Sequence, residues 1–134
     1  MTQFSVTARN AMLDALETAI GTGAILRLLT GSIPADCAAA QSGTLVAEMT
    51  LPSDWLAAAS NGSKVKSGTW QDLVANNTGI ITYYRILDSG ATTCHWQGPV
   101  SESGGGGDLI VDNNDVNAGQ EVVVDTFAVN MGGA

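Results

Sequence analysis

The spacing of apolar residues changes near residue 21, and this change constrains the fold more than any other feature of the sequence. Within residues 5–20, Leu13, Leu16 and Ile20 lie at positions i, i+3 and i+7, and Met12 widens the same stripe. Beyond residue 23, the apolar residues recur at every second position or in short continuous runs. The sequence therefore predicts one amphipathic helix followed by a chain of β-strands.

The ends of the predicted helix carry recognisable signals. Ser5 is a suitable N-cap, and Gly21 and Gly23 follow the last apolar position of the stripe. The polar side carries charged residues, and the apolar side must be buried against a sheet or a neighbouring subunit. We therefore take three residues as candidates for an oligomer interface: Met12, Leu16 and Ile20.

The strand signals are short and separated by turn residues. Strands are expected at 24–30, 45–51, around 64–66, 108–112 and 121–129, and a β-hairpin over 80–98 with its turn at Asp88, Ser89 and Gly90. The pattern of residues 53–78 indicates secondary structure less clearly than the rest of the chain. A turn is expected at Asn61-Gly62, and Trp55 and Trp70 are expected to anchor this region. A flexible glycine-rich loop is expected at 101–108 and a turn at 113–119.

The last strand contains a change of phase. Val122 and Val124 share one face, whereas Phe127 and Val129 fall on the other. All four can face the core only if one extra residue is inserted between the pairs. The sequence thus predicts a β-bulge at Asp125-Thr126.

Seven or eight short strands in 134 residues indicate a single domain. The expected fold class is mainly β: one β-sandwich of jelly-roll or immunoglobulin-like type with an N-terminal α-helix. No apolar run approaches the roughly 18 residues of a membrane-spanning helix, and the N-terminus has no basic segment leading into an apolar stretch. We therefore expect a soluble protein made in a cytoplasm, with no membrane partner.

The charge is strongly unbalanced. The net charge is −8, with only five Lys and Arg residues in the whole chain, which argues against nucleic acid as a partner. Residues after Arg85 include seven acidic side chains and no Lys or Arg. The acidic turns favour a basic partner surface, with Asp108, Asp112 and Asp115 as candidate docking residues, although a merely solvated surface gives the same pattern.

No catalytic, metal or cofactor site is predicted. His95 is the only histidine, and no sequence signature places a nucleophile and a carboxylate beside it. Residues 104–107 are four glycines, but they lack the lysine and helix of a phosphate-binding loop. Residues 112–115, DNND, offer oxygen ligands to Ca²⁺ without the spacing of an EF-hand, so an Asx-rich turn is favoured.

Cysteines and aromatic residues leave two interpretations open. Cys37 and Cys94 form no C-x-x-C pair, and in a cytoplasm both are expected to stay reduced and unlinked. Tyr83, Tyr84 and Trp96 can form an exposed platform for stacking sugars. They can equally fill the core or an oligomer interface.

Three segments carry a resemblance to a known family: ARNAMLDAL at 8–16, ITYYRILDSGATT at 81–93 and VNAGQEVVVDTFAV at 116–129. With them the chain resembles small virion proteins of tailed bacteriophages, such as capsid decoration or cement proteins and head or collar appendages. The resemblance implies a β-sandwich that assembles on a preformed shell, and it brings no catalytic residues.

The leading hypothesis is a non-enzymatic capsid decoration protein, made in the host bacterial cytoplasm and located on the virion. Its partners would be the major capsid protein or another virion protein and further copies of itself, as a dimer or trimer. One alternative is a carbohydrate-binding head or tail appendage that contacts the host surface. A weaker one is a hydrolase that uses His95.

Overall fold

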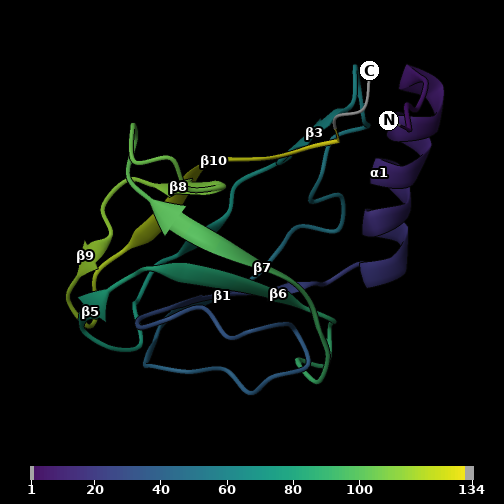
Figure 1. Ribbon diagram of the computed structural model, residues 1–134. Coiled ribbons are helices and arrows are strands. Elements are labelled where there is room, and N and C mark those ends of the chain that lie inside the picture. Colours follow the sequence, from purple (N-terminus) through teal and green to yellow (C-terminus); the bar gives the residue numbers. More distant parts are fainter. Residues whose placement is uncertain (1, 132–134) are drawn as a thin grey trace.

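The computed structural model describes residues 2–131 and shows one helix packed beside a curled β-sheet (Figure 1). The elements follow one another as α1 (Val6–Ile20), β1 (Ile25–Leu29), β2 (Leu45–Thr50), β3 (Ser63–Val65), β4 (Gln71–Asp72), β5 (Gly79–Ile80), β6 (Tyr83–Leu87), β7 (Cys94–Ser101), β8 (Leu109–Val111), β9 (Asp115–Val116) and β10 (Val122–Asn130).

Eight of these strands form the main sheet, in the order β2-β1-β6-β7-β8-β10-β3, with β4 also paired to β10. All of its pairs are antiparallel except β7 and β8, which run parallel. β5 and β9 form a separate two-stranded sheet. The predicted β-rich, sandwich-like fold with an N-terminal helix is confirmed, and the parallel pair is an addition that the sequence pattern did not indicate.

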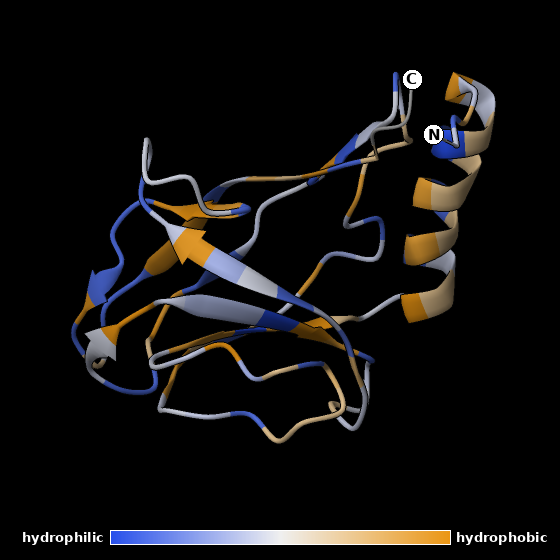
Figure 2. Cartoon of the chain, viewed as in Figure 1, coloured by the Kyte–Doolittle hydropathy of each residue, from blue (hydrophilic) through white to orange (hydrophobic). Residues whose placement is uncertain are grey.

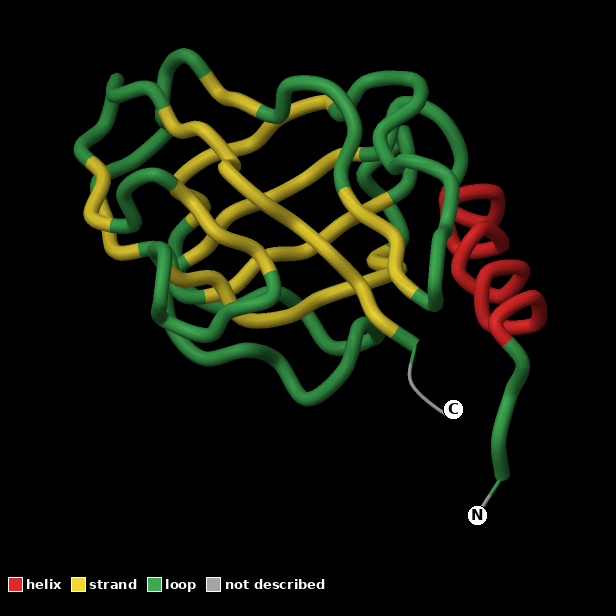
Figure 3. The backbone as a smooth tube through the Cα atoms, turned by 90° about the horizontal axis from the view of Figure 1, so that it is seen from above, coloured by secondary structure: helices red, strands yellow, loops and turns green. Residues whose placement is uncertain are grey.

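The main sheet curls until its two ends meet. Beyond β4, the backbone N–H of Asn76 donates to the carbonyl of Val46 at 2.7 Å, and the N–H of Glu48 donates to Asp72 Oδ2 at 3.0 Å. The view from above shows the strands wrapping around the interior, with α1 outside them at one end (Figure 3). The curl encloses the hydrophobic core.

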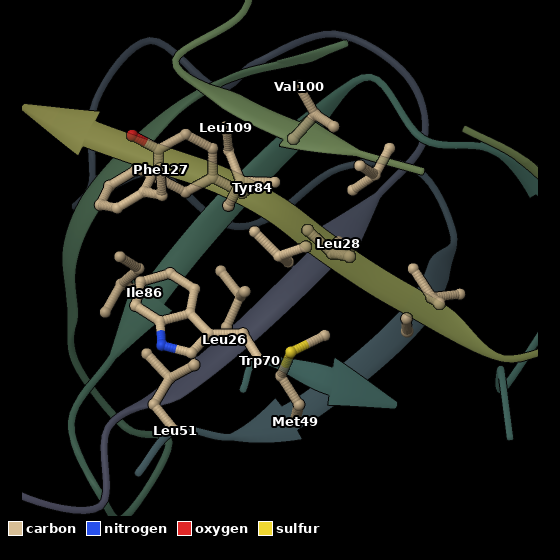
Figure 4. Close-up of a cluster of buried hydrophobic side chains, with 14 of the residues drawn as sticks. Leu26, Leu28, Met49, Leu51, Trp70, Tyr84, Ile86, Val100, Leu109 and Phe127 are labelled. Carbon is tan, nitrogen blue, oxygen red and sulfur yellow. The ribbon is translucent and has the colours of Figure 1, made fainter. Parts of the chain in front are cut away.

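Aromatic side chains fill a large part of this core (Figure 4). Trp55, Trp70, Tyr84 and Phe127 are all almost completely buried. The Trp70 ring centroid lies 6.0 Å from that of Trp55 and 5.4 Å from that of Phe127, spacings that favour tilted ring contacts. The prediction that Trp55 and Trp70 act as anchors is confirmed.

The predicted helix ends are confirmed. Ser5 Oγ accepts a hydrogen bond from the backbone N–H of Ala8 at 3.1 Å, which satisfies a donor that has no partner within the helix. Gly21 ends the helix with φ of +88°, and its N–H donates to the carbonyl of Glu17 at 2.9 Å. Glycine adopts this positive φ without the strain that a Cβ would cause.

The helix docks mainly through polar acceptors. The side chains of Asn10, Asp14 and Glu17 accept hydrogen bonds from backbone N–H groups of the 56–62 segment at 2.9 to 3.1 Å. Lys64 of β3 is 2% exposed, and its Nζ lies 2.6 Å from Asp14 Oδ1 and 2.8 Å from the carbonyl of Ala57. These acceptors satisfy backbone donors that have no strand partner, so the polar side of the helix also belongs to the interface.

The apolar stripe of the helix is only partly buried. Leu13 and Ile20 are buried, whereas Met12 and Leu16 remain partly exposed. Figure 2 shows hydrophobic segments on the side of α1 that is turned toward the sheet. The stripe therefore contributes to the core of this chain itself, Ile20 most of all.

Two of the predicted turns and the bulge are found where they were expected, whereas the turn predicted at 113–119 is wrong in part, because Asp115–Val116 forms β9 and pairs with β5. Asn61 and Gly62 both have positive φ and form a two-residue turn closed by Ser60 and Ser63. In the hairpin of β6 and β7, the turn extends from Asp88 to Thr93.

The bulge lies in β10, where the pairing to β8 shifts between Val124 and Thr126 and leaves Asp125 as the extra residue. Val122, Val124 and Phe127 are consequently all at most 1% exposed.

The glycine-rich loop folds back on the end of β7. The N–H of Gly107 donates to Ser101 Oγ at 2.9 Å, and a Cβ at Gly107 would lie 2.7 Å from the backbone nitrogen of Ser101. Only glycine permits this approach, which reverses the chain so that β8 can run parallel to β7. Flexibility of the loop stays a prediction.

Candidate functional site

A gap in the main sheet forms the candidate site. β8 is three residues long and pairs with only the last two residues of β7, so residues 94–99 of β7 have β6 on one side and no strand on the other. Across the gap, residues 128–130 of β10 pair with β3. A pocket of about 260 Å³ lies here, lined by Tyr84, Trp96, Asp108, Ala128, Val129 and Asn130.

Aromatic rings form the inner wall of this pocket. Trp96 is partly exposed, and its ring centroid lies 5.0 Å from that of Phe127 in an edge-to-face arrangement. Tyr84 contacts the same phenylalanine edge-on at 5.4 Å (Figure 4). Because both contacts are packed against the core, the indole and the phenol are held in fixed positions at the pocket.

Two oxygen atoms meet above Gly98. The side-chain hydroxyl of Tyr84 and Asp108 Oδ2 each lie 2.8 Å from the position that a Cβ of Gly98 would occupy. Any larger residue at this position would displace one of the two oxygens. A glycine within a strand often marks such a close approach, and it was the signal in the sequence that could have indicated the pocket.

The Tyr84 hydroxyl is an unsatisfied polar group. It is fully buried and has no hydrogen-bond partner among the described residues. Burial raises the pKa of Tyr84, the negative charge of Asp108 raises it further, and the nearby indole N–H of Trp96 lowers it. The hydroxyl is therefore neutral at all physiological pH values, and its unmade hydrogen bond is a free-energy cost to the folded chain.

Asp108 is exposed at the mouth of the pocket. Within residues 2–131, its carboxylate takes part in no ion pair and no hydrogen bond. The pocket thus combines an unpaired carboxylate, a buried hydroxyl and an indole ring. This set of groups suits a ligand that donates hydrogen bonds.

The three acidic docking candidates are separated by the structure. Asp108 precedes β8, whereas Asp112 follows it and Asp115 begins β9. Asp112 Oδ1 accepts from the N–H of Asn113 at 2.9 Å, and Asn113 Oδ1 accepts from the N–H of Asp115 at 3.0 Å. These side-chain to backbone bonds are those of an Asx-rich turn, the favoured interpretation of this segment.

The two acidic loops nevertheless approach each other, since the N–H of Asn114 lies 3.4 Å from Glu102 Oε1. Among residues 2–131, no group of three His, Cys, Asp or Glu side chains is arranged to hold a metal ion. His95 is exposed in β7, and its side chain makes no hydrogen bond to a described residue. The charge of His95 is near enough to Asp88 to contribute to the lowered pKa of that carboxyl, after the hydrogen bonds from Thr92 and Thr93.

The alternative of a sugar-stacking platform is wrong for its two tyrosines, since Tyr83 and Tyr84 are both 0% exposed. Tyr84 points into the core and packs against Phe127, whereas Tyr83 lies on the outer face of β6, which the 31–43 loop covers. Tyr83 accepts a hydrogen bond from the N–H of Ser42 at 3.0 Å and donates to the carbonyl of Ser42 at 2.7 Å. Arg85 secures the same loop by donating to the carbonyl of Ala39 at 2.7 Å.

This loop also brings the two cysteines together. Cys37 lies beside Cys94 of β7, and both are free thiols of intermediate exposure. Burial raises the pKa of Cys37 to about 11, and a hydrogen bond with Cys94 adds to this shift. Their proximity arises from the path of the 31–43 loop across the sheet, and no local pattern of residues indicates it.

The candidate residues for an oligomer interface differ in their accessibility. Ile20 belongs to the core of this chain, while Met12 and Leu16 are partly exposed and their role in self-association stays a prediction. Several large apolar side chains are exposed elsewhere, most strongly Leu73 at 60% and Val74 at 66%.

Comparison of the chain with protein-family models, with curated proteins and with solved structures finds no significant match in any of the three. No helix within residues 2–131 has the length and apolar character needed to cross a membrane.

Proposed function

We propose that this protein is a non-enzymatic structural component of a tailed-phage virion, a capsid decoration or cement protein that docks on the major capsid shell as a dimer or trimer. Three things support the proposal: the sequence resemblance, the β-rich fold with its covered core, and the distribution of charge. Such a function requires a surface that recognises a partner, and it requires no chemical reaction.

The distribution of charge is the observation that carries the proposal. Three of the five cationic side chains, Arg9, Lys64 and Arg85, are buried, and Arg27 is paired to Glu48 at 2.6 Å. The acidic side chains of the C-terminal half, in contrast, are almost all exposed: Glu102, Asp108, Asp112, Asp115, Glu121 and Asp125. The accessible surface is therefore more acidic than the net charge of −8 indicates, which favours docking on a basic partner.

Occupancy on capsids tests this function. The Asp108→Asn, Asp112→Asn, Asp115→Asn triple variant is added to capsids that lack the decorating protein, at low and at high salt. Each exposed ion pair contributes roughly 0.2–1 kcal/mol, so the variant should show lower occupancy at low salt and little difference at high salt. Asp54→Asn, an exposed carboxylate beside the end of α1, is the matched control and should behave as the wild type.

The proposal is rejected if the wild-type protein does not bind capsids, and unchanged occupancy of a folded triple variant at low salt moves docking away from the acidic loops. The oligomer is tested by sedimentation, where a monomer at tens of micromolar protein, about the dissociation constant of a weak interface, contradicts self-association.

A second function, a carbohydrate-binding appendage, is favoured by Trp96 alone. Its indole is partly exposed in a pocket that also holds a carboxylate, an arrangement that suits stacking on a sugar ring. Binding on a glycan array that is lost in Trp96→Ala would support this function. An array without binding would reject it.

A further inference from the structure

We infer that the pocket between β7 and β10 is a binding site for one cationic side chain of the partner, an arginine in preference to a lysine. The inference rests on the proposed function only in its assignment of the side chain to a virion protein. The site itself is argued from the groups that line the pocket.

The size of the pocket selects a single side chain. Its volume of about 260 Å³ lies below the roughly 300–1,000 Å³ of pockets that hold drug-sized ligands. A guanidinium group with its neighbouring methylenes fits this space, and a helix or a folded loop does not. Asp108 at the mouth of the pocket is exposed to solvent, so a side chain of a docked partner can enter the pocket there.

The polar groups of the pocket are arranged for a ligand with several donors. The Asp108 carboxylate and the Tyr84 hydroxyl lie on either side of the space above Gly98, and neither has a partner among residues 2–131. A guanidinium presents donors in a rigid fork, and can donate to two oxygens at once. One ligand group would satisfy both atoms.

The indole of Trp96 provides the third interaction. A cation over an indole face is stabilised by about 0.5–1 kcal/mol at exposed sites and more where water is excluded. The contact of Trp96 with Phe127 at 5.0 Å fixes the orientation of its ring. The ligand therefore meets a prearranged surface and little ordering cost remains.

Among the residues that the structure describes, no cation occupies this site. Residues 86–131 contain no Lys or Arg. Lys64 pairs with Val129 across β3 and β10, but its Nζ is held by Asp14 and Ala57 on the side of α1. The carboxylate of Asp108 is thus left for a charge from outside the molecule.

Charge separates this ligand from a neutral sugar. A neutral ligand that covers Asp108 removes water from the carboxylate without supplying an opposite charge, and such desolvation is costly. A guanidinium compensates this cost through charge-assisted hydrogen bonds, which are about twice as strong as neutral ones. The pocket accordingly favours a cation.

The test uses N-acetyl-arginine amide as the probe and N-acetyl-citrulline amide as its uncharged isostere. Binding to the full chain is followed by chemical-shift changes of the Trp96 indole N–H. We expect a dissociation constant on the order of millimolar for arginine, because a single side chain lacks the rest of the interface, and binding at least tenfold weaker for citrulline. Asp108→Asn should weaken arginine binding about tenfold, while the control Asp54→Asn, at an exposed carboxylate beside the end of α1, leaves it unchanged.

A second variant tests the buried hydroxyl. Tyr84→Phe removes an atom that has no partner, so it should weaken arginine binding without lowering the stability of the free protein. Equal binding of arginine and citrulline, an unaffected Asp108→Asn variant, or binding of methyl glycosides in place of arginine would each overturn the inference. Arginine binding by a chain that does not decorate capsids would reject the proposed function and leave this site intact.

Discussion

Deletion of Asp125 tests how the bulge in β10 supports the core. Asp125 is exposed and is the extra residue between Val124, which pairs with Val111, and Thr126, which pairs with Ile110. Without it, Val122, Val124 and Phe127 fall at alternate positions of a regular strand, so all three can still face the core. Deletion of Val123 instead removes a residue before the bulge, and the shift of one residue then turns Val122 away from the face that Val124 and Phe127 share.

The structure sets the cost of each deletion. The two valines and the phenylalanine are each at most 1% exposed. Deletion of Asp125 keeps them in phase, and Phe127 keeps its contacts with Trp70, Tyr84 and Trp96, so we expect a loss of at most about 1 kcal/mol. Deletion of Val123 exposes one buried valine, which costs roughly 1.5–3 kcal/mol.

Urea unfolding followed by tryptophan fluorescence measures both losses. The control is Asp125→Ala, which keeps the number of residues and should change the free energy of unfolding by less than about 0.5 kcal/mol, since the side chain is exposed. Equal losses for the two deletion variants, or a loss of about 3 kcal/mol on deletion of Asp125, would refute the reasoning.

Three further predictions follow from the helix cap, the thiols and the buried lysine. Ser5→Ala should lower the free energy of unfolding by about 1 kcal/mol in thermal denaturation followed by circular dichroism, because an N-cap acceptor is lost; no change would contradict the cap. Alkylation of the unfolded chain without reductant should modify both Cys37 and Cys94, because both are free thiols, and an intact disulfide in fresh protein would contradict this. The pKa of Cys37 is about 11 in the folded chain and about 9 when the thiol is not buried. The free energy of unfolding should therefore fall as the pH rises from 9 to 11, and this fall should be absent in Cys37→Ala. The hydrogen bond from Lys64 lowers the pKa of Asp14. The contribution of Asp14 to the free energy of unfolding is therefore present above the ordinary carboxyl pKa of about 4 and is lost as the pH falls below that value. Asp14→Asn should reduce the loss of stability at acid pH, and an unchanged loss would show that Asp14 does not cause it.

The local features of this chain were determined by the sequence. The cap at Ser5, the glycine that ends the helix, the Asn61-Gly62 turn and the hairpin around Asp88 each depend on a few adjacent residues. The bulge at Asp125 was also predictable, because the phase of the buried residues in one strand is visible without knowledge of their partners. For this reason the β-rich class and the helix were correctly predicted.

The tertiary structure decided which distant segments meet. Tyr83 is buried because the 31–43 loop covers the outer face of β6, and Tyr84 is buried because it packs against Phe127 in the core. The pocket exists because β8 is too short to fill the space between β7 and β10, and Tyr84, Trp96 and Asp108 meet there from three separate segments. Long-range pairing and loop placement depend on the packing of the whole chain, which local periodicity does not encode.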